Sequence, residues 1–301
     1  MFEKFNEGAQ RALILGQEAA AREKHEFLGT EHIMFGLLQA PGEVNAGLFR
    51  RLKMDLRKLV EQVETMLHKN VPMDEAKPDV PFSELAKKSL EKSVEIAKEL
   101  GEENIGQEHL LLGMLSEPKT DASKAFGNIG FDDPAKLREE IRNEIESTKK
   151  RKTILAMLNE DASKALVHAK EDAREKWNDS VGTEHILLGM LRNLECPASR
   201  VLIKLGSDVR LLQKVIREIT PPGKEKPMDG ATPHLSLDAK TMIDSAEKEA
   251  KEMGHNYIGT EHLLLGMLSL KTCAAASALN RTGISNLKKV RLIVNKELET
   301  K

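Results

Sequence analysis

A glutamate and a histidine that stand side by side four times are the residues of this chain best suited to chemistry. Each pair lies just after a glycine and just before an apolar run. A carboxylate next to an imidazole suggests proton transfer or metal binding, because both groups act as general bases and as metal ligands. The four phrases are Gly29-Thr30-Glu31-His32, Gly106-Gln107-Glu108-His109, Gly182-Thr183-Glu184-His185 and Gly259-Thr260-Glu261-His262.

The spacing of these residues argues against both kinds of chemistry. Zinc proteases use His-Glu-x-x-His, which places two histidines on one face of a helix. His25-Glu26 begins that pattern, but position 29 is glycine. Neighbours such as Glu31 and His32 point about 100° apart on a helix and do not meet at one ion. We therefore expect packed, hydrogen-bonded histidines, no metal, no cofactor and no catalytic residue. The chain also lacks the strand-turn-helix context of a hydrolase nucleophile, so we do not expect an enzyme.

The fixed spacing of the phrases predicts four copies of one folding unit. The motif glycines are 77, 76 and 77 residues apart, and such a period is typical of repeat architectures. Pro-rich joints at 69–82 and 220–233 link copies one to two and three to four, whereas the joint near residue 150 lacks Pro and Gly and suits a continuous helix. We predict two domains, 1–149 with repeats 1–68 and 82–148, and 150–301 with repeats 153–219 and 234–301.

Each copy reads as helical throughout. A helix N-cap residue opens it: Asn6, Ser83, Asn159 or Ser236. An amphipathic helix follows, which we expect to end at a left-handed glycine in two copies, Gly101 and Gly254. The motif glycine should then allow a turn, with Thr30, Thr183 or Thr260 capping a buried second helix. A short Ala-rich segment and a last amphipathic helix complete the unit. The pattern predicts an all-α fold, about eight helices per domain and little or no strand.

The composition narrows the partners. Aromatic residues make up 3% and the net charge is −2, so the chain offers neither stacking platforms nor a basic surface for nucleic acid. It has no apolar run of about 20 residues, so we expect no membrane partner and a cytoplasmic location. The two cysteines, Cys196 and Cys273, occupy equivalent places in copies three and four; we expect them to be reduced and half-buried.

The first 70 residues resemble the N-terminal domain of Clp-family unfoldases, closest to the ClpC type. The resemblance is carried by Phe2, Phe5, Ala9, Gln17-Glu18, the Gly-Thr-Glu-His motif and Leu37. It implies a double repeat of about 75 residues per copy, present here as two tandem double domains. The family's unfoldases continue into ATPase modules with a Gly-x-x-x-x-Gly-Lys-Ser/Thr loop. This sequence has no such loop, and its only Gly-Lys pair, Gly223-Lys224, lies in a Pro-rich joint.

The resemblance implies a non-catalytic module that binds proteins or peptides: Clp substrates, adaptors or regulators, and the Clp ATPase or protease itself. One alternative is an N-terminal fragment or accessory subunit of a ClpC-type unfoldase. The other is a passive helical scaffold.

The resemblance also implies two sites. In the family, the motif glutamate and a hydroxyl residue that caps the first helix hold phosphorylated arginine. Carried over within each copy, this pairs Glu31 with Asn6, Glu108 with Ser83, Glu184 with Asn159 and Glu261 with Ser236. This chain departs from the family at its Asn caps and at Gln107, which stands in place of threonine. The second implied site is a groove beside Phe2 and Phe82, which we expect to differ in the second domain, where Leu155 and Pro233-His234-Leu235 lie nearby.

Overall fold

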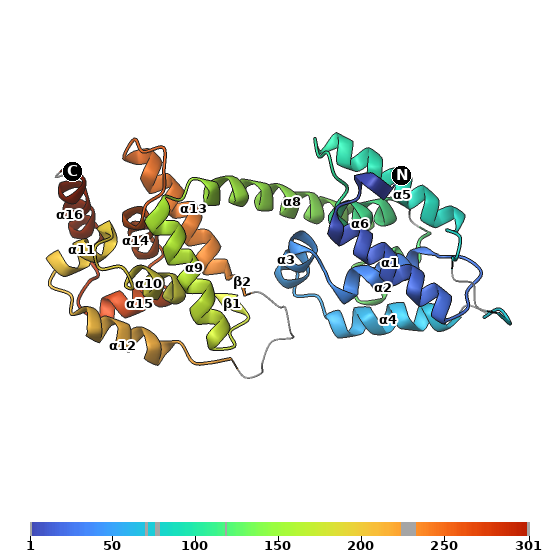
Figure 1. Cartoon of the computed structure of the whole chain (residues 1–301), viewed down its shortest axis with the longest axis horizontal. Helices are drawn as coiled ribbons and strands as arrows, with labels where there is room; N and C mark the ends of the chain where they lie inside the picture. The colour runs from blue at the N-terminus through green and yellow to red at the C-terminus, as the bar shows by residue number, and fades with distance from the viewer. Residues whose placement is uncertain (1, 70–71, 76–78, 118, 224–232, 300–301) are drawn as a thin grey trace. The chain divides into compact units, whose positions relative to one another are not determined.

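The computed structural model describes residues 2–69, 72–75, 79–117, 119–223 and 233–299 (Figure 1). Contacts divide the chain into two compact units, Met1–Lys149 and Lys150–Lys301. The fold is all-α, as predicted: the described residues form sixteen α-helices, one 3₁₀-helix and two strands of two residues each. Lys224 and parts of both Pro-rich joints lie outside the described residues.

The first unit contains two copies of a four-helix repeat. A 3₁₀-helix, Phe2–Lys4, precedes the first copy. The helices of copy one are α1 (Glu7–Arg22), α2 (Thr30–Gln39), α3 (Glu43–Arg51) and α4 (Leu56–Lys69). Those of copy two are α5 (Glu84–Glu99), α6 (Gln107–Ser116), α7 (Asp121–Asn128) and α8 (Pro134–Ala156). Helix α8 runs through the joint near residue 150, as its lack of Pro and Gly indicated.

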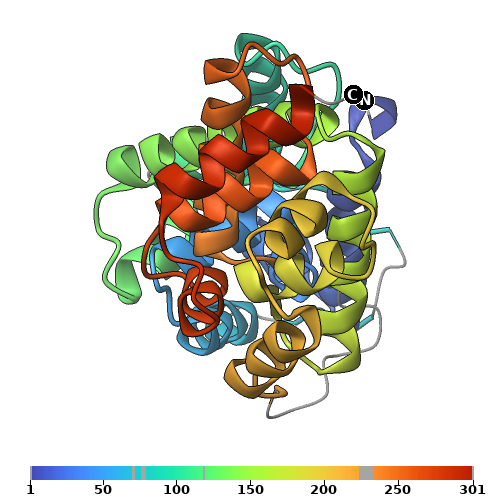
Figure 2. The same cartoon turned by 90° about the vertical axis from the view of Figure 1, so that its left-hand side faces the viewer.

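The second unit repeats this order. Copy three has α9 (Glu160–Glu175), β1 (Ser180–Val181), α10 (Thr183–Met190), α11 (Pro197–Lys204) and α12 (Val209–Ile219). Copy four has β2 (His234–Leu235), α13 (Leu237–Glu252), α14 (Thr260–Ser269), α15 (Ala274–Arg281) and α16 (Leu287–Glu299). Figure 2 views this unit, in which the dark red α16 packs against α14 and α11.

The predicted caps open the first helix of every copy. Side-chain oxygens of Asn6, Ser83, Asn159 and Ser236 each accept the backbone N–H three residues on, at 2.9–3.2 Å. These helices end where predicted, because Gly101 and Gly254 adopt φ of +70° and +73°. In copies one and three the same left-handed position is held by Lys24 and Trp177, at φ of 58° and 57°. A side chain there is disfavoured by its own Cβ, so packing enforces the turn.

The first two helices of each copy approach closely, because glycine stands at their crossing. A Cβ added to Gly36 would lie 1.9 Å from the carbonyl oxygen of Ala12, and one added to Gly189 would lie 2.1 Å from that of Ala165. No side chain fits in that space. The small residues along α1 and α9 therefore let the buried motif helix lie directly against them.

Short parallel bridges join the copies within each unit. Phe5 pairs with Ile105 and Leu28 with Phe82; in the second unit Leu158 pairs with Ile258, and β1 pairs with β2. The residue before each cap thereby lies opposite the residue that precedes the partner copy's motif glycine. The backbone N–H groups of Asn6, Ser83, Asn159 and Ser236 donate to the carbonyl oxygens of Ile105, Leu28, Ile258 and Val181. These backbone hydrogen bonds bring the cap residue of one copy next to the motif of the other copy.

Within the described residues no single helix is long and apolar enough to cross a membrane; α14 and α15, bent by 90°, pass that test only as a pair and only by length and composition.

Candidate functional site

The motif histidine is a helix-capping residue in all four copies. The backbone N–H of the motif glycine donates to Nδ1 of the histidine three residues on, at 3.0, 2.9, 3.0 and 2.9 Å in copies one to four. This bond satisfies an N–H at the start of the motif helix, as the reach-back half of a capping box does. His32, His109, His185 and His262 are at most 2% exposed. The expectation of packed, hydrogen-bonded histidines is confirmed.

The motif glycine makes room for the glutamate. The glycines have φ between −87° and −96° and ψ near 180°, which is extended backbone that any residue adopts. The expectation that they allow a turn is therefore wrong. A Cβ on Gly29 would lie 2.2 Å from a carboxylate oxygen of Glu31, and the other three copies give 2.2–2.3 Å. The carboxylate folds back over the glycine, so a larger residue at the glycine would force the glutamate side chain to move.

The motif threonine caps a helix of the partner copy. We expected Thr30, Thr183 and Thr260 to cap their own helix, but each is already its first helical residue. Their hydroxyls instead accept the backbone N–H of Asp121, Ala275 and Ala198, at the starts of α7, α15 and α11. Gln107, in the same position of copy two, accepts the N–H of Gly42 and donates to the carbonyl oxygens of Gly8 and Ala40. Gln107 therefore still forms a hydrogen bond to the partner copy, although it replaces the motif threonine.

One position that the sequence analysis overlooked differs among the four copies. It lies seven residues before the motif histidine and holds His25, Glu102, Asn178 and His255 in copies one to four. In copies one and four the second histidine's Nδ1 lies 2.7 and 2.9 Å from Nε2 of the motif histidine. In copy three, Nε2 of His185 donates to Oδ1 of Asn178 at 3.2 Å. Copies one and four also have an aromatic residue two positions later, Phe27 and Tyr257, which the sequence could have revealed.

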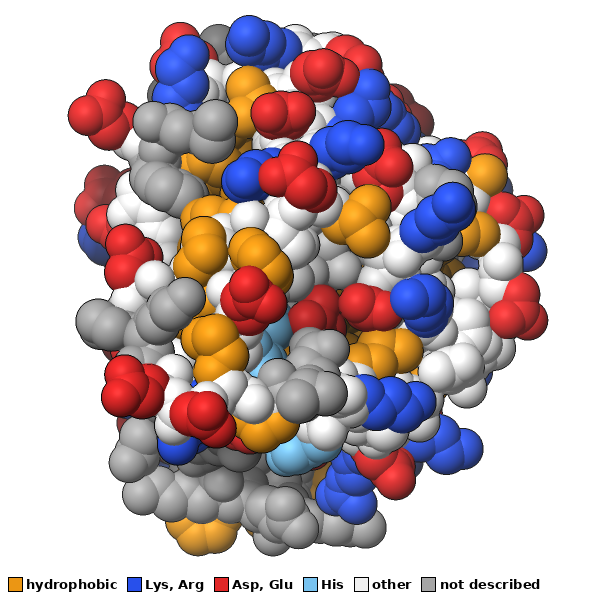
Figure 3. All heavy atoms as spheres, turned by 90° about the vertical axis from the view of Figure 1, so that its right-hand side faces the viewer, with side chains coloured by type: hydrophobic (Ala, Val, Ile, Leu, Met, Phe, Trp, Pro, Cys, Tyr) orange, Lys and Arg blue, Asp and Glu red, His pale blue; other side chains and the backbone are white. Residues whose placement is uncertain are grey.

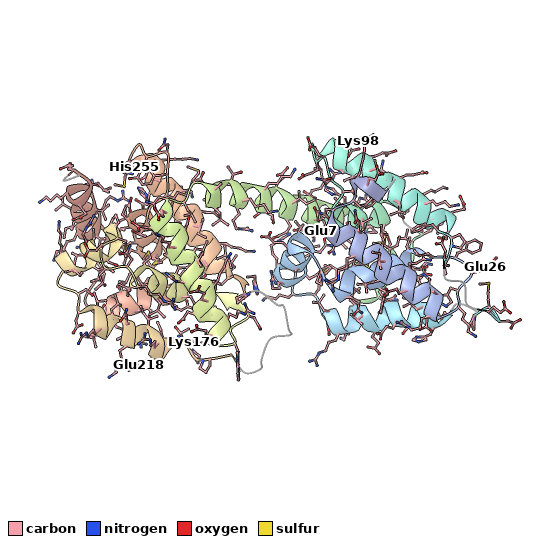
Figure 4. The ribbon with its side chains drawn as sticks, viewed as in Figure 1. Glu7, Glu26, Lys98, Lys176, Glu218 and His255 are labelled. Carbon is pink, nitrogen blue, oxygen red and sulfur yellow. The ribbon has the colours of Figure 1, made fainter. Side chains whose placement is uncertain are left out.

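The structure pairs motif glutamates and caps across copies. A pocket of about 310 Å³ holds Glu31 together with Ser83, Glu26, Phe27 and Asp121. A second pocket, of about 340 Å³, holds Glu261 together with Asn159, Asp161, Tyr257 and His255. The within-copy pairs Glu31 with Asn6 and Glu261 with Ser236 are therefore wrong. Figure 4 labels Glu26 and His255, which mark these two pockets on their separate units.

The backbone hydrogen bonds between copies also argue against the pairs of Glu108 with Ser83 and Glu184 with Asn159. The backbone N–H of Asn6 donates to the carbonyl oxygen of Ile105, two residues from Gln107, and that of Ser236 donates to the carbonyl oxygen of Val181, next to Gly182. The cap of copy one thus neighbours the motif that contains Glu108, and the cap of copy four neighbours the motif that contains Glu184. The side chains of these two glutamates are 21% and 16% exposed, against 7% and 1% for Glu31 and Glu261.

Burial disfavours the charged form of three histidines, His262, His109 and His25. It lowers the pKa of His262 to about 4, with a further contribution from His255. It also lowers the pKa of His109, and for His25 burial acts together with His32. Neutral imidazoles fit the geometry, since a ring nitrogen that accepts a backbone N–H carries no proton. Burial, followed by the charge of Glu261, raises the pKa of Tyr257.

A groove of the first unit includes Phe82, one of the two phenylalanines named for the expected groove. It has a volume of about 470 Å³ and runs along α1. Phe82 lies in it with Leu13 and Ile14, while the amides of Gln10 and Gln17 and the carboxylates of Glu3 and Asp79 supply its polar groups. Phe2 begins the 3₁₀-helix, but its side chain lies outside the described part of the chain. Figure 3 shows one face of this unit, where apolar side chains form a band among acidic and basic ones.

The corresponding surface of the second unit has a different composition. Val167 on α9 takes the place of Ile14 and is 54% exposed. Lys170 replaces Gln17, Ala156 replaces Glu3, and Leu235 in β2 replaces Phe82. The acidic and aromatic groups of the first groove are therefore missing from these positions.

Comparison with known proteins finds a family model that matches the repeats of this chain. The model of the Clp repeat (R) N-terminal domain matches residues 4–129, 81–154 and 157–282. The chain is 39% identical over 126 residues to "Negative regulator of genetic competence ClpC/MecB" of Bacillus subtilis and 36% identical over 126 residues to "Chaperone protein ClpB" of Oceanobacillus iheyensis. Each match covers 42% of this chain and 15% of the relative. Among solved structures, the N-terminal domain of the chaperone ClpD from Arabidopsis thaliana aligns with 48% of this chain and 97% of its own, at 22% identity and a TM-score of 0.39.

Proposed function

We propose, from the premise that this chain belongs to the Clp repeat (R) N-terminal domain family, that it is a protein-binding module that recruits peptides or partner proteins to Clp-dependent proteolysis. The observation that carries the proposal is the groove along α1. Leu13 and Phe82 also pack into the core of the unit, whereas Ile14 lies outside that core and is left exposed to solvent.

The groove has the composition of a peptide site. Ile14 is 58% exposed at its rim, although burying such a side chain is worth about 1.5–3 kcal/mol. Gln10 and Gln17 supply amide groups that can bond to a peptide backbone, and Glu3 and Asp79 supply negative charge. We therefore propose that the groove takes an apolar side chain flanked by basic residues. Pockets of this kind combine apolar walls with a few polar groups that fix orientation.

A pair of matched variants tests the groove. We expect Ile14→Lys to weaken binding of basic-apolar peptides, selected against the whole chain, by about tenfold or more, since it fills the groove and adds a like charge. Val167→Lys, on an equally exposed helix position of the second unit, is the control and should bind normally. Fluorescence anisotropy measures both. Equal affinity of Ile14→Lys and wild type would reject the groove.

The link to proteolysis has its own test. We propose that the chain delivers partners to a Clp unfoldase or competes with the unfoldase's own N-terminal domain for them. Adding it to a reconstituted ClpC-type protease should therefore change the degradation rate of a groove-binding substrate, and Ile14→Lys should abolish that change. An unchanged rate with wild-type chain would leave a scaffold role as the better account.

We also propose that the pockets at Glu31 and Glu261 hold an arginine side chain, in plain or phosphorylated form. A carboxylate pairs with a guanidinium, and the Ser83 hydroxyl and the Asn159 amide each have a donor to offer a phosphate. Asp121 and Asp161 line the same pockets and repel phosphate, so the two forms of arginine need separate assays.

The decisive assay compares arginine-phosphorylated and plain protein in a pull-down. Wild type should retain at least one form, and Glu31→Gln combined with Glu261→Gln should retain neither. The matched control is Glu108→Gln, whose motif lacks the second histidine and the aromatic residue, and it should bind as wild type does. Equal capture by wild type and the double variant would reject this part of the proposal.

A further inference from the structure

Three side chains of copy four converge on one point. His255, Glu261 and His262 each present a ligand atom, and these atoms all lie within 4.8 Å of one another. It is the only such group among the residues that the structure describes. We propose that this cluster binds a divalent transition-metal cation of the zinc type. The inference does not depend on the proposed peptide function. It revises our expectation of no metal, which considered adjacent residues and the His-Glu-x-x-His pattern but not a histidine seven residues away.

The two histidines supply the primary ligands. Nδ1 of His255 and Nε2 of His262 are 2.9 Å apart, and their rings are inclined at 70°. A tetrahedral zinc ion about 2.0–2.1 Å from each nitrogen requires them to be about 3.3 Å apart. The rings therefore need to separate by about 0.4 Å, with the cation replacing the proton that now bridges them.

The proton of His262 moves when the metal binds. In the metal-free chain Nδ1 accepts the N–H of Gly259, so the ring proton is on Nε2. Coordination through Nε2 transfers that proton to Nδ1, and the ring stays neutral. Oε1 of Glu261 lies 3.6 Å from Nδ1, so the carboxylate must move closer to accept a hydrogen bond from the relocated N–H. The proton stays on Nδ1, which gives the carboxylate–histidine–metal arrangement common in zinc sites. The N–H of Gly259 then turns to the carboxylate of Glu261, which already lies over that glycine.

The site is accessible and its remaining ligands are at hand. His255 is half-buried and lines the pocket of about 340 Å³ with Asn159, Asp161 and Tyr257. Tyr257 stacks on the His255 ring, with centroids 5.1 Å apart and planes 8° from parallel. Stacking holds the ring in place, and the pocket leaves space for water or an Asp161 oxygen to complete the coordination shell.

The third copy supplies a matched variant. There Asn178 takes the place of His255 and still accepts the Nε2 proton of the motif histidine. The substitution His255→Asn therefore removes a ligand while keeping a hydrogen bond that this fold already tolerates. In isothermal titration of the whole chain with Zn²⁺, we expect one site that His255→Asn weakens by about tenfold or more. The exposed pair of His168 and Glu171 controls for surface binding, so His168→Asn should leave that site unchanged.

A second measurement reports on the same site without a variant. Zn²⁺ should shift the backbone amide resonance of Gly259 in the wild-type chain, because its hydrogen-bond acceptor changes, and should leave that of Gly182 in place. Absence of saturable Zn²⁺ binding, equal affinity of wild type and His255→Asn, or an unmoved Gly259 resonance at saturation would each overturn the proposal.

Discussion

Individual motif residues serve the fold more than the chemistry they suggested. The histidine accepts a backbone N–H, and the glycine makes space for a carboxylate. Alanine would remove the acceptor at the histidine position and would displace the glutamate carboxylate at the glycine position. The glutamate and the residue seven positions before the histidine can also take part in binding, and in copy four so can the second ring nitrogen of the histidine. What each site can bind therefore depends on residues outside the four-residue motif.

Acid should destabilise the second unit through His262. Its pKa is about 4 in the folded chain, below the usual 6.5. Between these values the unfolded chain binds more protons, so the free energy of unfolding falls as pH drops from 6.5 to 4. The full loss is roughly 3 kcal/mol for this one side chain. Urea unfolding of fragment 150–301 at pH 7 and pH 4.5 measures it, and unchanged stability would contradict the assigned burial.

At the scale of elements, two devices recur. Glycine at the crossing of the first two helices lets a buried motif helix touch its neighbour's backbone. A side chain at the start of each motif helix then caps a helix of the partner copy. The copies are thus joined by polar contacts as well as by a shared core, which explains why they occur in pairs.

The helix crossing predicts a severe effect of one methyl group. Gly189→Ala would place Cβ 2.1 Å from the carbonyl oxygen of Ala165, and backbone cannot move aside cheaply. We expect a loss of about 3 kcal/mol. Gly127→Ala, also in a helix but with its nearest atom at 3.4 Å, should be neutral or stabilise by up to about 1 kcal/mol. Thermal unfolding followed by circular dichroism compares them, and similar melting temperatures would show that the crossing is looser than described.

The cap across copies predicts a smaller effect. Thr183→Val keeps the shape of the side chain but removes the acceptor of the Ala275 N–H, which is 3.1 Å away and buried. We expect a loss of about 1 kcal/mol. Faster hydrogen exchange at the amide of Ala275 would locate the effect. The amide of Leu187, which lies in α10 together with Thr183, serves as the reference. An unaltered exchange rate at Ala275 would remove the threonine from this role.

For the whole molecule, the two units carry different sites on the same repeat. The groove along α1 lies on the first unit, and the proposed metal cluster lies on the second. The two units thus share one repeat architecture, and a few differing residues separate the sites proposed on them.

Each unit should fold alone. Separate cores contain residues 5–145 and 154–294, and we predict that fragments 1–149 and 150–301 each unfold cooperatively. Their melting temperatures should lie within a few degrees of the two transitions of the whole chain, as calorimetry can measure. An unfolded fragment would mean that the units stabilise each other.

Sequence alone determined the repeat, the helical class, the cap residues and the left-handed helix ends. These depend on local chemistry: periodicity, N-cap side chains and glycine are visible one helix at a time. Sequence reasoning failed where partners come from another copy. It paired Glu31 with Asn6 and expected Thr30 to cap its own helix. The parallel bridges that bring side chains of one copy next to the motif of the other leave no signal in the local sequence. Only the tertiary structure could bring Glu31 to Ser83, and His255 to a histidine seven residues away across a turn, since both contacts depend on how helices are arranged in space.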